Sequence, residues 1–390
     1  AGVLLRETDR QTRNELTRAL EDYFLSAVLD NMAYDDAADI LGRLPEDQRD
    51  RLLKLVKPER ADEMKDLLQY PHDTAGGIMN SRFVSIKAEA TIEEAIAEVR
   101  KQTKGFLTPR IFVVDEKEVL KGYVPTGKLL ARNTSAPISD AMITHFVTVS
   151  TGMDQEEVAR IVTTYDLYTV PVVDEEGRLV GIITMDDVVD VIHDEASEDA
   201  LKLSGTSAEE LGERSAMRVA RTRMPWLMIS WLEGILAMLV LGFFEGELEK
   251  AVVLSTFIPV IMAMGGNAGI QAATVAVRGL AMGDIAGRDI LQVLFREFRV
   301  GLALGVTFGV LLGLIAHFLY ITSFANLGIV VGLAILNQVT LGVLVGTFLP
   351  IFFKRLNVDP AVATTPFVTA TLDISGIVIY FYLAKIILPL

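Results

Sequence analysis

The sequence predicts a multidomain membrane protein with an acidic soluble half followed by five membrane-spanning helices. Charge supports this division, because residues 222–390 carry nine basic and nine acidic side chains, which leaves the whole net charge of −15 on residues 1–221. Apolar length supports it too, since five C-terminal stretches are each long enough to cross a hydrocarbon core of about 30 Å. A motif repeated after about 60 residues adds a duplicated α/β unit to the soluble half.

Composition excludes several classes of site. The chain has no cysteine, which excludes disulfides and thiolate metal sites, and its four histidines lack the spacing of a zinc site. We find no nucleophile–base set and no Walker loop, so we expect no enzyme. The acidity disfavours nucleic acid as a partner and favours cations. The N-terminus lacks a basic-then-apolar signal peptide, so we expect the soluble half to stay in the cytoplasm.

Residues 1–73 are predicted to form an all-α domain of short helical hairpins. Asp35 to Leu44 fits a helix that ends in a turn at Pro45. Glu46 to Lys57 fits the next helix, with Leu52 and Val56 among its apolar positions. Hairpins of this length bury their apolar faces by stacking on one another.

The duplication lies within residues 74–196. The first copy contains Val113-Val114-Asp115 and Gly122, and the second contains Val172-Val173-Asp174 and Gly181. Each copy predicts a short strand, an amphipathic helix, two strands joined by a turn, and a final helix. This pattern resembles a tandem pair of CBS domains, which we place at 74–135 and 136–196.

The second copy also carries the CBS-type pattern G-h-h-T-x-x-D, where h is apolar. In that family the threonine and the aspartate often hold a nucleotide ribose, and Thr184 and Asp187 match them. The first copy has Pro125 and Lys128 at these places. The resemblance therefore implies at most one ordinary adenosine site per chain, with ATP as its candidate ligand.

A connecting helix over 197–222 is predicted to join the CBS pair to the membrane domain, 223–390. Seven acidic residues fall between Asp186 and Asp199, whereas Arg218, Arg221 and Arg223 follow later. Carboxylates about 6 Å apart repel by roughly 3 kcal/mol at an effective dielectric constant near 20. The acidic run is either a solvated face or one side of an interface that closes when divalent cations enter it.

The five spans are predicted at about 225–244, 252–280, 292–321, 327–353 and 361–388. With the N-terminus inside, eight Lys and Arg residues near the span ends are cytoplasmic and two are outside. This asymmetry and the odd number of spans predict a multi-pass protein of the cell membrane with its C-terminus outside.

Asp373 is the most informative residue of the membrane half. A carboxylate at the centre of a span costs about 2.5–3.5 kcal/mol on insertion scales, so it usually faces a partner or a water-filled path. Thr369 lies four residues earlier on the same helix face, Thr365 continues the stripe, and Pro366 frees a backbone carbonyl. These oxygens suit a hard cation, although a structural hydrogen bond to a neighbouring helix is the alternative.

Two other intramembrane features are polar. Gly265-Gly266-Asn267-Ala268-Gly269 in the second span fits either close packing through small residues or a polar pore wall around Asn267. Glu233 lies nearer the cytoplasmic end of the first span, where a carboxylate can reach water.

The order of these parts resembles the MgtE family of magnesium channels over essentially the full chain. The most specific matches are Arg221 to Trp226, Gly265 to Gln271, and Asn357 to Asp373. The resemblance implies a lipid-embedded homodimer whose pore lies on the two-fold axis, with Asp373 as the pore acid and Asn267 and Thr369 nearby.

The same resemblance implies a gate that closes when cytoplasmic Mg²⁺ is high. In this chain, the acidic residues at the implied sensor positions are Asp35, Asp39, Asp154, Glu156, Asp166, Asp187, Glu195, Glu198 and Asp199. Two other functions stay open: a CBS-containing, nucleotide-sensing membrane regulator that transports nothing, and a secondary transporter coupled to another cation.

Overall fold

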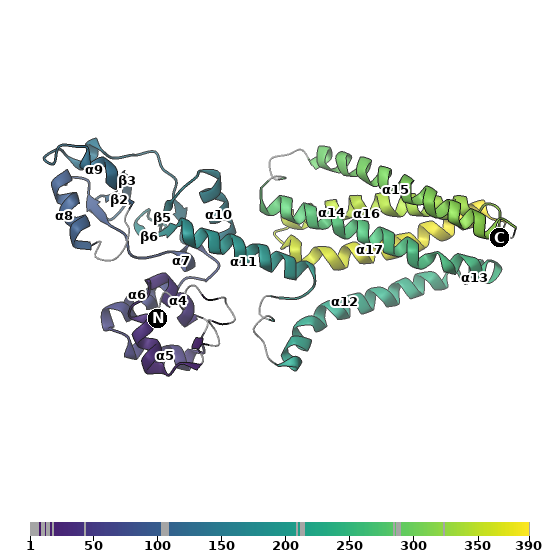
Figure 1. Cartoon of the computed structure of the whole chain (residues 1–390), viewed down its shortest axis with the longest axis horizontal. Coiled ribbons are helices and arrows are strands. Elements are labelled where there is room, and N and C mark those ends of the chain that lie inside the picture. Colours follow the sequence, from purple (N-terminus) through teal and green to yellow (C-terminus); the bar gives the residue numbers. More distant parts are fainter. Residues whose placement is uncertain are drawn as a thin grey trace. The chain divides into compact units, whose positions relative to one another are not determined.

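The computed structural model describes residues 8, 12, 16–17, 19–42, 44–102, 109–207, 210, 215–283, 285, 290–322 and 324–389, and the first residues of the predicted domain 1–73 fall outside these ranges. The chain divides into two compact units, residues 1–195 and 196–390. Each unit is described by itself (Figure 1). The predicted fold class, with N-terminal helices, a CBS-like pair and five long apolar helices, is confirmed.

The N-terminal helices enclose a small apolar core formed by residues such as Leu25, Leu41 and Met64. Arg60 donates to the carbonyls of Leu29 and Met32, at 2.9 and 2.6 Å, and so ties the last of these helices to the end of the first. The helices are α3 (Asp22–Leu29), α4 (Tyr34–Gly42), α5 (Glu46–Leu55) and α6 (Pro58–Leu67).

Two equivalent three-stranded sheets follow the N-terminal helices. Each sheet pairs its first two strands in parallel and its last two antiparallel, and each has an irregular register after a matching valine, Val113 or Val172. The first copy contains α7 (Ala75–Ile78), β1 (Ser85–Lys87), α8 (Ile92–Gln102), β2 (Arg110–Val114), β3 (Leu120–Pro125) and α9 (Thr126–Leu130). The second contains η1 (Ile138–Asp140), β4 (Val149–Ser150), α10 (Gln155–Thr164), β5 (Thr169–Val173), β6 (Leu179–Thr184) and α11 (Met185–Leu203).

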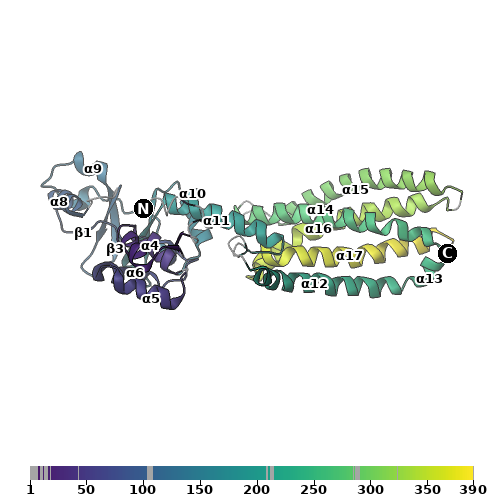
Figure 2. The ribbon, with the colours of Figure 1, turned by 60° about the horizontal axis from the view of Figure 1, so that its bottom comes forward.

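The second unit is a bundle of long helices in which α16 packs against α14, α15 and α17, while α12 packs along α17 (Figures 1 and 2). Its elements are α12 (Ala216–Gly242), α13 (Glu245–Lys250), η3 (Val252–Thr256), α14 (Ile258–Ala281), α15 (Ile290–Tyr320), α16 (Leu327–Arg355) and α17 (Pro360–Ile387). Five of these segments are long and apolar enough to cross a membrane, which agrees with the predicted spans.

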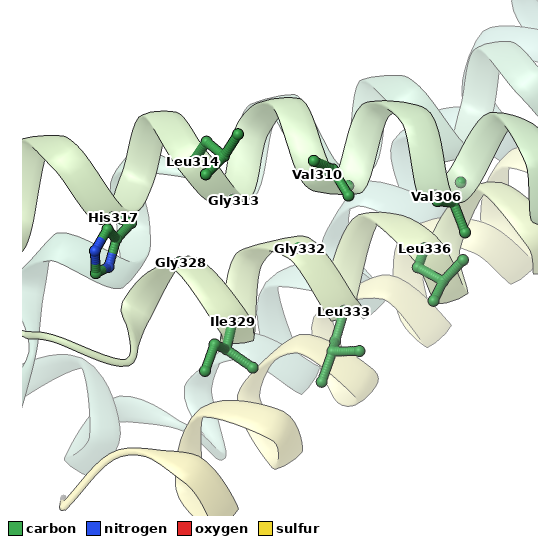
Figure 3. A pocket seen from close by; sticks show the side chains of 12 residues that line it. Val306, Val310, Gly313, Leu314, His317, Gly328, Ile329, Gly332, Leu333 and Leu336 are labelled. Carbon is green, nitrogen blue, oxygen red and sulfur yellow. The ribbon is translucent and has the colours of Figure 1, made fainter.

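Glycines allow α15 and α16 to pack closely along their length (Figure 3). A Cβ atom at Gly309 would lie 2.6 Å from the carbonyl oxygen of Gly332, so a larger residue cannot fit without moving the backbone. The apolar groove beside this contact has a volume of about 380 Å³ and is lined by residues such as Val310, Leu314 and Ile329. None of the residues that line this groove is acidic.

The predicted single connecting helix over 197–222 is wrong. Helix α11 ends at Leu203 and α12 begins at Ala216, and the described residues between them are not α-helical. Gly205 adopts a φ of 72°, a left-handed conformation that glycine tolerates and that ends a right-handed helix.

Candidate functional site

The packing of α12 along α17 brings two intramembrane acids together. Glu233 of α12 and Asp373 of α17 are both half-buried, and their carboxyl groups are close enough to hydrogen-bond. The Thr369 hydroxyl lies 3.3 Å from Glu233 Oε2 and 3.1 Å from the carbonyl oxygens of Thr365 and Pro366. Two carboxyl groups and one hydroxyl, all oxygen ligands, therefore lie close together between α12 and α17.

Within the described ranges, no lysine or arginine forms an ion pair with Glu233 or Asp373. Two carboxylates that approach each other in a medium of low dielectric constant repel strongly unless a proton or a cation lies between them. The arrangement thus fits a small, hard, doubly charged cation, whose preferred ligands are oxygens.

Glu233 is the residue that sequence reasoning underestimated. Its position along α12 suggested contact with water, but the structure places it against Asp373 and Thr369. The signal available in the sequence was a second isolated acid in an apolar span. Its partner depends on helix packing, which local sequence does not specify.

Two other predicted pore residues have different surroundings. Asn267 is exposed on α14. Thr365 donates a hydrogen bond of 2.8 Å to the carbonyl oxygen of Leu203 at the end of α11. The Thr365 hydroxyl therefore ties α17 to α11, while Thr365 lies one turn before Thr369 on the same face of α17.

In the first unit, the negative charge of Asp35 on α4 acts on Asp187 of α11. Burial, followed by the negative charge of Asp35, raises the pKa of Asp187 to about 7. Burial, followed by the charge of Asp36, raises the pKa of Asp35 to about 6. The structure thus brings together one predicted sensor residue from the N-terminal helices and one from the second CBS-like copy.

Asp187 also accepts a hydrogen bond from Thr184, the last residue of β6. Thr184 Oγ1 lies 2.6 Å from Asp187 Oδ2 and also hydrogen-bonds to Asp186. The two residues predicted to hold a nucleotide therefore bond to each other in this structure.

The remaining predicted sensors of the first unit are spread over several positions. Asp154 is exposed and caps α10 by accepting from the Glu156 backbone N–H at 2.8 Å. Asp166 is exposed at the end of α10 with a φ of 50°, a conformation that aspartate adopts more readily than most residues. Asp39 lies one turn after Asp35 on α4, and Glu195 accepts from Gln155 Nε2 at 2.6 Å.

In the second unit, a lysine bridges two acids. Lys202 Nζ lies 2.6 Å from Glu198 Oε1 and 2.8 Å from Asp359 Oδ2 at the start of α17. Burial lowers the pKa of Lys202, but hydrogen bonds to Asp359 and Glu198 outweigh it and raise the pKa above its ordinary value. Asp199, next to Glu198, is half-buried. Sequence reasoning missed Lys202, although its i,i+4 spacing from Glu198 was visible.

Among the residues that the structure describes, no group of three or more His, Asp or Glu side chains is already arranged to hold a metal ion.

Family models match most of the chain. Residues 258–383 match a family described as a divalent cation transporter, and residues 1–73 match an intracellular N-terminal domain of MgtE proteins. Residues 75–132 and 138–194 match CBS domains. The intracellular description agrees with the predicted cytoplasmic location of the soluble half.

The chain is also similar to curated magnesium transporters named MgtE. It is 38% identical over 360 residues to that of Thermus thermophilus, which covers 91% of this chain and 79% of the relative. It is 36% identical to that of Enterococcus faecalis, over 84% of this chain and 72% of the relative. A solved structure of the cytosolic domain of the Mg²⁺ channel MgtE in complex with ATP is 36% identical, with a TM-score of 0.47, over 49% of this chain and 79% of that chain.

Proposed function

Because the chain belongs to the MgtE family of divalent cation transporters, we propose that it carries Mg²⁺ across the membrane as a channel. The observation that carries this proposal is the contact of Glu233 with Asp373 and Thr369 in the membrane half. Two carboxylates match the charge of one Mg²⁺ ion. Because Mg²⁺ gives up its water reluctantly, the acids would contact an ion that keeps much of its hydration shell.

We further propose that two chains form the pore around a two-fold axis. Asn267 is exposed in the single chain, and an isologous interface would place its amide on the inner surface of a dimer. Such an axis would also bring two copies of Asp373 near each other. In this arrangement the N-terminus is cytoplasmic and the C-terminus is outside.

The proposed gate closes when cytoplasmic Mg²⁺ is plentiful. Facing acids such as Asp35 and Asp187 support it, because a bound cation would remove their repulsion and hold α4 against α11. Mg²⁺ can bias the gate only by binding the closed form more tightly than the open form. We propose that the other predicted sensor residues contribute to the same gate.

The decisive experiment is Mg²⁺ flux into liposomes that contain the full chain. Asp373→Ala should abolish flux, because it removes the carboxylate, and Glu233→Gln should reduce it. Thr371→Ala is the matched control, since Thr371 is exposed on the same helix and donates only to the Phe367 carbonyl oxygen. Undiminished flux in Asp373→Ala would reject the proposed path.

The same liposomes separate the two alternatives. A coupled transporter predicts flux that follows an imposed Na⁺ or pH gradient, whereas a channel predicts flux that follows membrane voltage. A nucleotide-sensing regulator predicts ATP binding at Thr184 and Asp187 without any Mg²⁺ flux.

A further inference from the structure

A glutamine lies in the centre of the membrane bundle, next to the residue that precedes Asp373. Gln338 of α16 is only 1% exposed, and its Nε2 donates a hydrogen bond of 2.7 Å to the carbonyl oxygen of Leu372 on α17. That carbonyl also belongs to the backbone ladder of α17, where the N–H of residue i+4 is its regular donor. The side-chain bond is therefore an addition to a helix that is complete without it.

Two glycines create the space for this amide. A Cβ atom at Gly265 of α14 would lie 2.5 Å from Gln338 Cγ, and one at Gly376 of α17 would lie 2.7 Å from Gln338 Nε2. Separations below 3.0 Å force an atom to move. Three helices thus meet at one side chain, and two of them carry glycine at the positions that face it.

The amide is only half satisfied. Gln338 Oε1 is buried and has no hydrogen-bond partner among the described residues. An unpaired buried acceptor destabilises a fold, so stability alone favours an apolar residue of similar size at this position. A role beyond stability accounts for a glutamine here better than packing does.

We propose that Gln338 is a positioning residue for the ion path: it fixes the rotation and height of α17 at Leu372, so that Asp373 and Thr369 face Glu233 of α12. This inference rests on the proposed function, because it assigns Gln338 to the Asp373 site. A rotation of α17 by a fraction of a turn would move the Asp373 carboxylate and the Thr369 hydroxyl away from Glu233 of α12, since neighbouring side chains on a helix point in different directions.

The test compares Gln338→Met with the unchanged full chain in liposomes. Methionine has a similar length but cannot donate the hydrogen bond. We expect the Mg²⁺ concentration for half-maximal flux to rise roughly 10- to 100-fold, as for other small misplacements of a functional group, with a parallel loss of discrimination against Ca²⁺. We expect the thermal unfolding midpoint in detergent to stay equal or rise, because the unpaired acceptor is gone.

Glycine variants provide an independent arm. Gly376→Ala places a methyl group where the amide now lies and should reproduce the Gln338→Met flux defect. Gly242→Ala is the control, because a Cβ there meets nothing within 4 Å. The conservative variant Gln338→Asn, whose shorter amide can follow a small shift of α17, should recover part of the discrimination.

The outcomes separate this proposal from the proposed function. If the unchanged chain carries no Mg²⁺, the proposed function fails. If it transports and Asp373→Ala does not, normal half-saturation and discrimination in Gln338→Met overturn only the role of Gln338. A Gln338→Met chain that melts lower or aggregates also overturns it, because the amide would then hold the bundle together.

Discussion

Replacing one of the facing acids in the soluble half should strengthen the contact that Mg²⁺ is proposed to close. Asp187→Asn keeps the size of the side chain and leaves an oxygen that can accept from Thr184. It removes a charge whose ionisation is opposed by burial and by Asp35. Without divalent cations at pH 8, the variant should therefore hold α4 against α11 more tightly than the unchanged chain does.

The magnitude follows from the pKa of this carboxyl group. Burial and Asp35 raise the pKa of Asp187 from an ordinary value of 3.8 to about 7. At about 1.4 kcal/mol per pKa unit, this corresponds to roughly 4 kcal/mol for the ionised group. Asp35 shares the repulsion and the contact can relax. We therefore expect the contact of α4 with α11 at pH 8 to be more stable in the variant by on the order of 2–4 kcal/mol.

The pH dependence has a definite sign. A carboxyl group with a raised pKa binds its proton more tightly in the folded state, so its stabilising effect is complete below about pH 4. That effect is lost as the pH rises through about 6 for Asp35 and about 7 for Asp187. Mg²⁺ should restore the contact at pH 8 and have little effect at pH 5, where the carboxyl groups are protonated.

Limited proteolysis of the full chain in detergent measures this contact, with chelator, Mg²⁺ or Ca²⁺ at pH 5 and pH 8. Glu116→Gln is the control, because Glu116 is an exposed carboxylate in the turn before β3. Faster cleavage of Asp187→Asn than of the unchanged chain, at pH 8 with chelator, would refute the argument. So would a cleavage rate of the unchanged chain, with chelator, that is the same at pH 5 and pH 8.

Three further predictions concern other contacts. Lys202→Met removes the positive charge between Glu198 and Asp359. The Mg²⁺ concentration that protects the chain from protease should therefore fall about three- to fivefold, equivalent to about 1 kcal/mol. An unchanged Mg²⁺ titration would contradict this. Gly309→Leu should lower the thermal midpoint by an amount equivalent to about 1–3 kcal/mol, because its Cβ meets a backbone carbonyl of α16. Asp154→Ala should lower the free energy of unfolding by about 1 kcal/mol, because it removes the cap of α10. Asp154→Asn keeps the cap, so a changed Mg²⁺ response in that variant would assign Asp154 to sensing.

The elements were predictable where a single local pattern decides them. Apolar length located the five spans, and the repeated turn and strand motifs located both CBS-like copies. Asp373 was predicted as a candidate site residue because a carboxylate in an apolar helix requires a partner, whichever residue or ion that partner is. These inferences use only the energetics of one segment in its solvent.

Features that depend on contacts between helices were not predictable. The contact of Glu233 with Asp373 depends on how α12 lies along α17, and neither helix specifies this alone. The break at Gly205 was missed because the residues around it permit a helix, whereas the observed fold ends α11 there. Lys202 was missed because its second partner, Asp359, lies 157 residues further along the chain.

The end of α11 is anchored to the start of α17, the helix that carries Asp373. Lys202 contacts Asp359, and Leu203 accepts from Thr365, so α11 holds both the first residue before α17 and its second turn. From Asp359 to Asp373 the chain is helical, and at 1.5 Å per residue this distance is about 21 Å. A cation that displaced Lys202 from Asp359 would alter the anchor of the helix that carries Asp373. Pro366, which lacks a backbone N–H, lies between the anchor and the acid, so we infer that α17 bends there rather than moving as one rod.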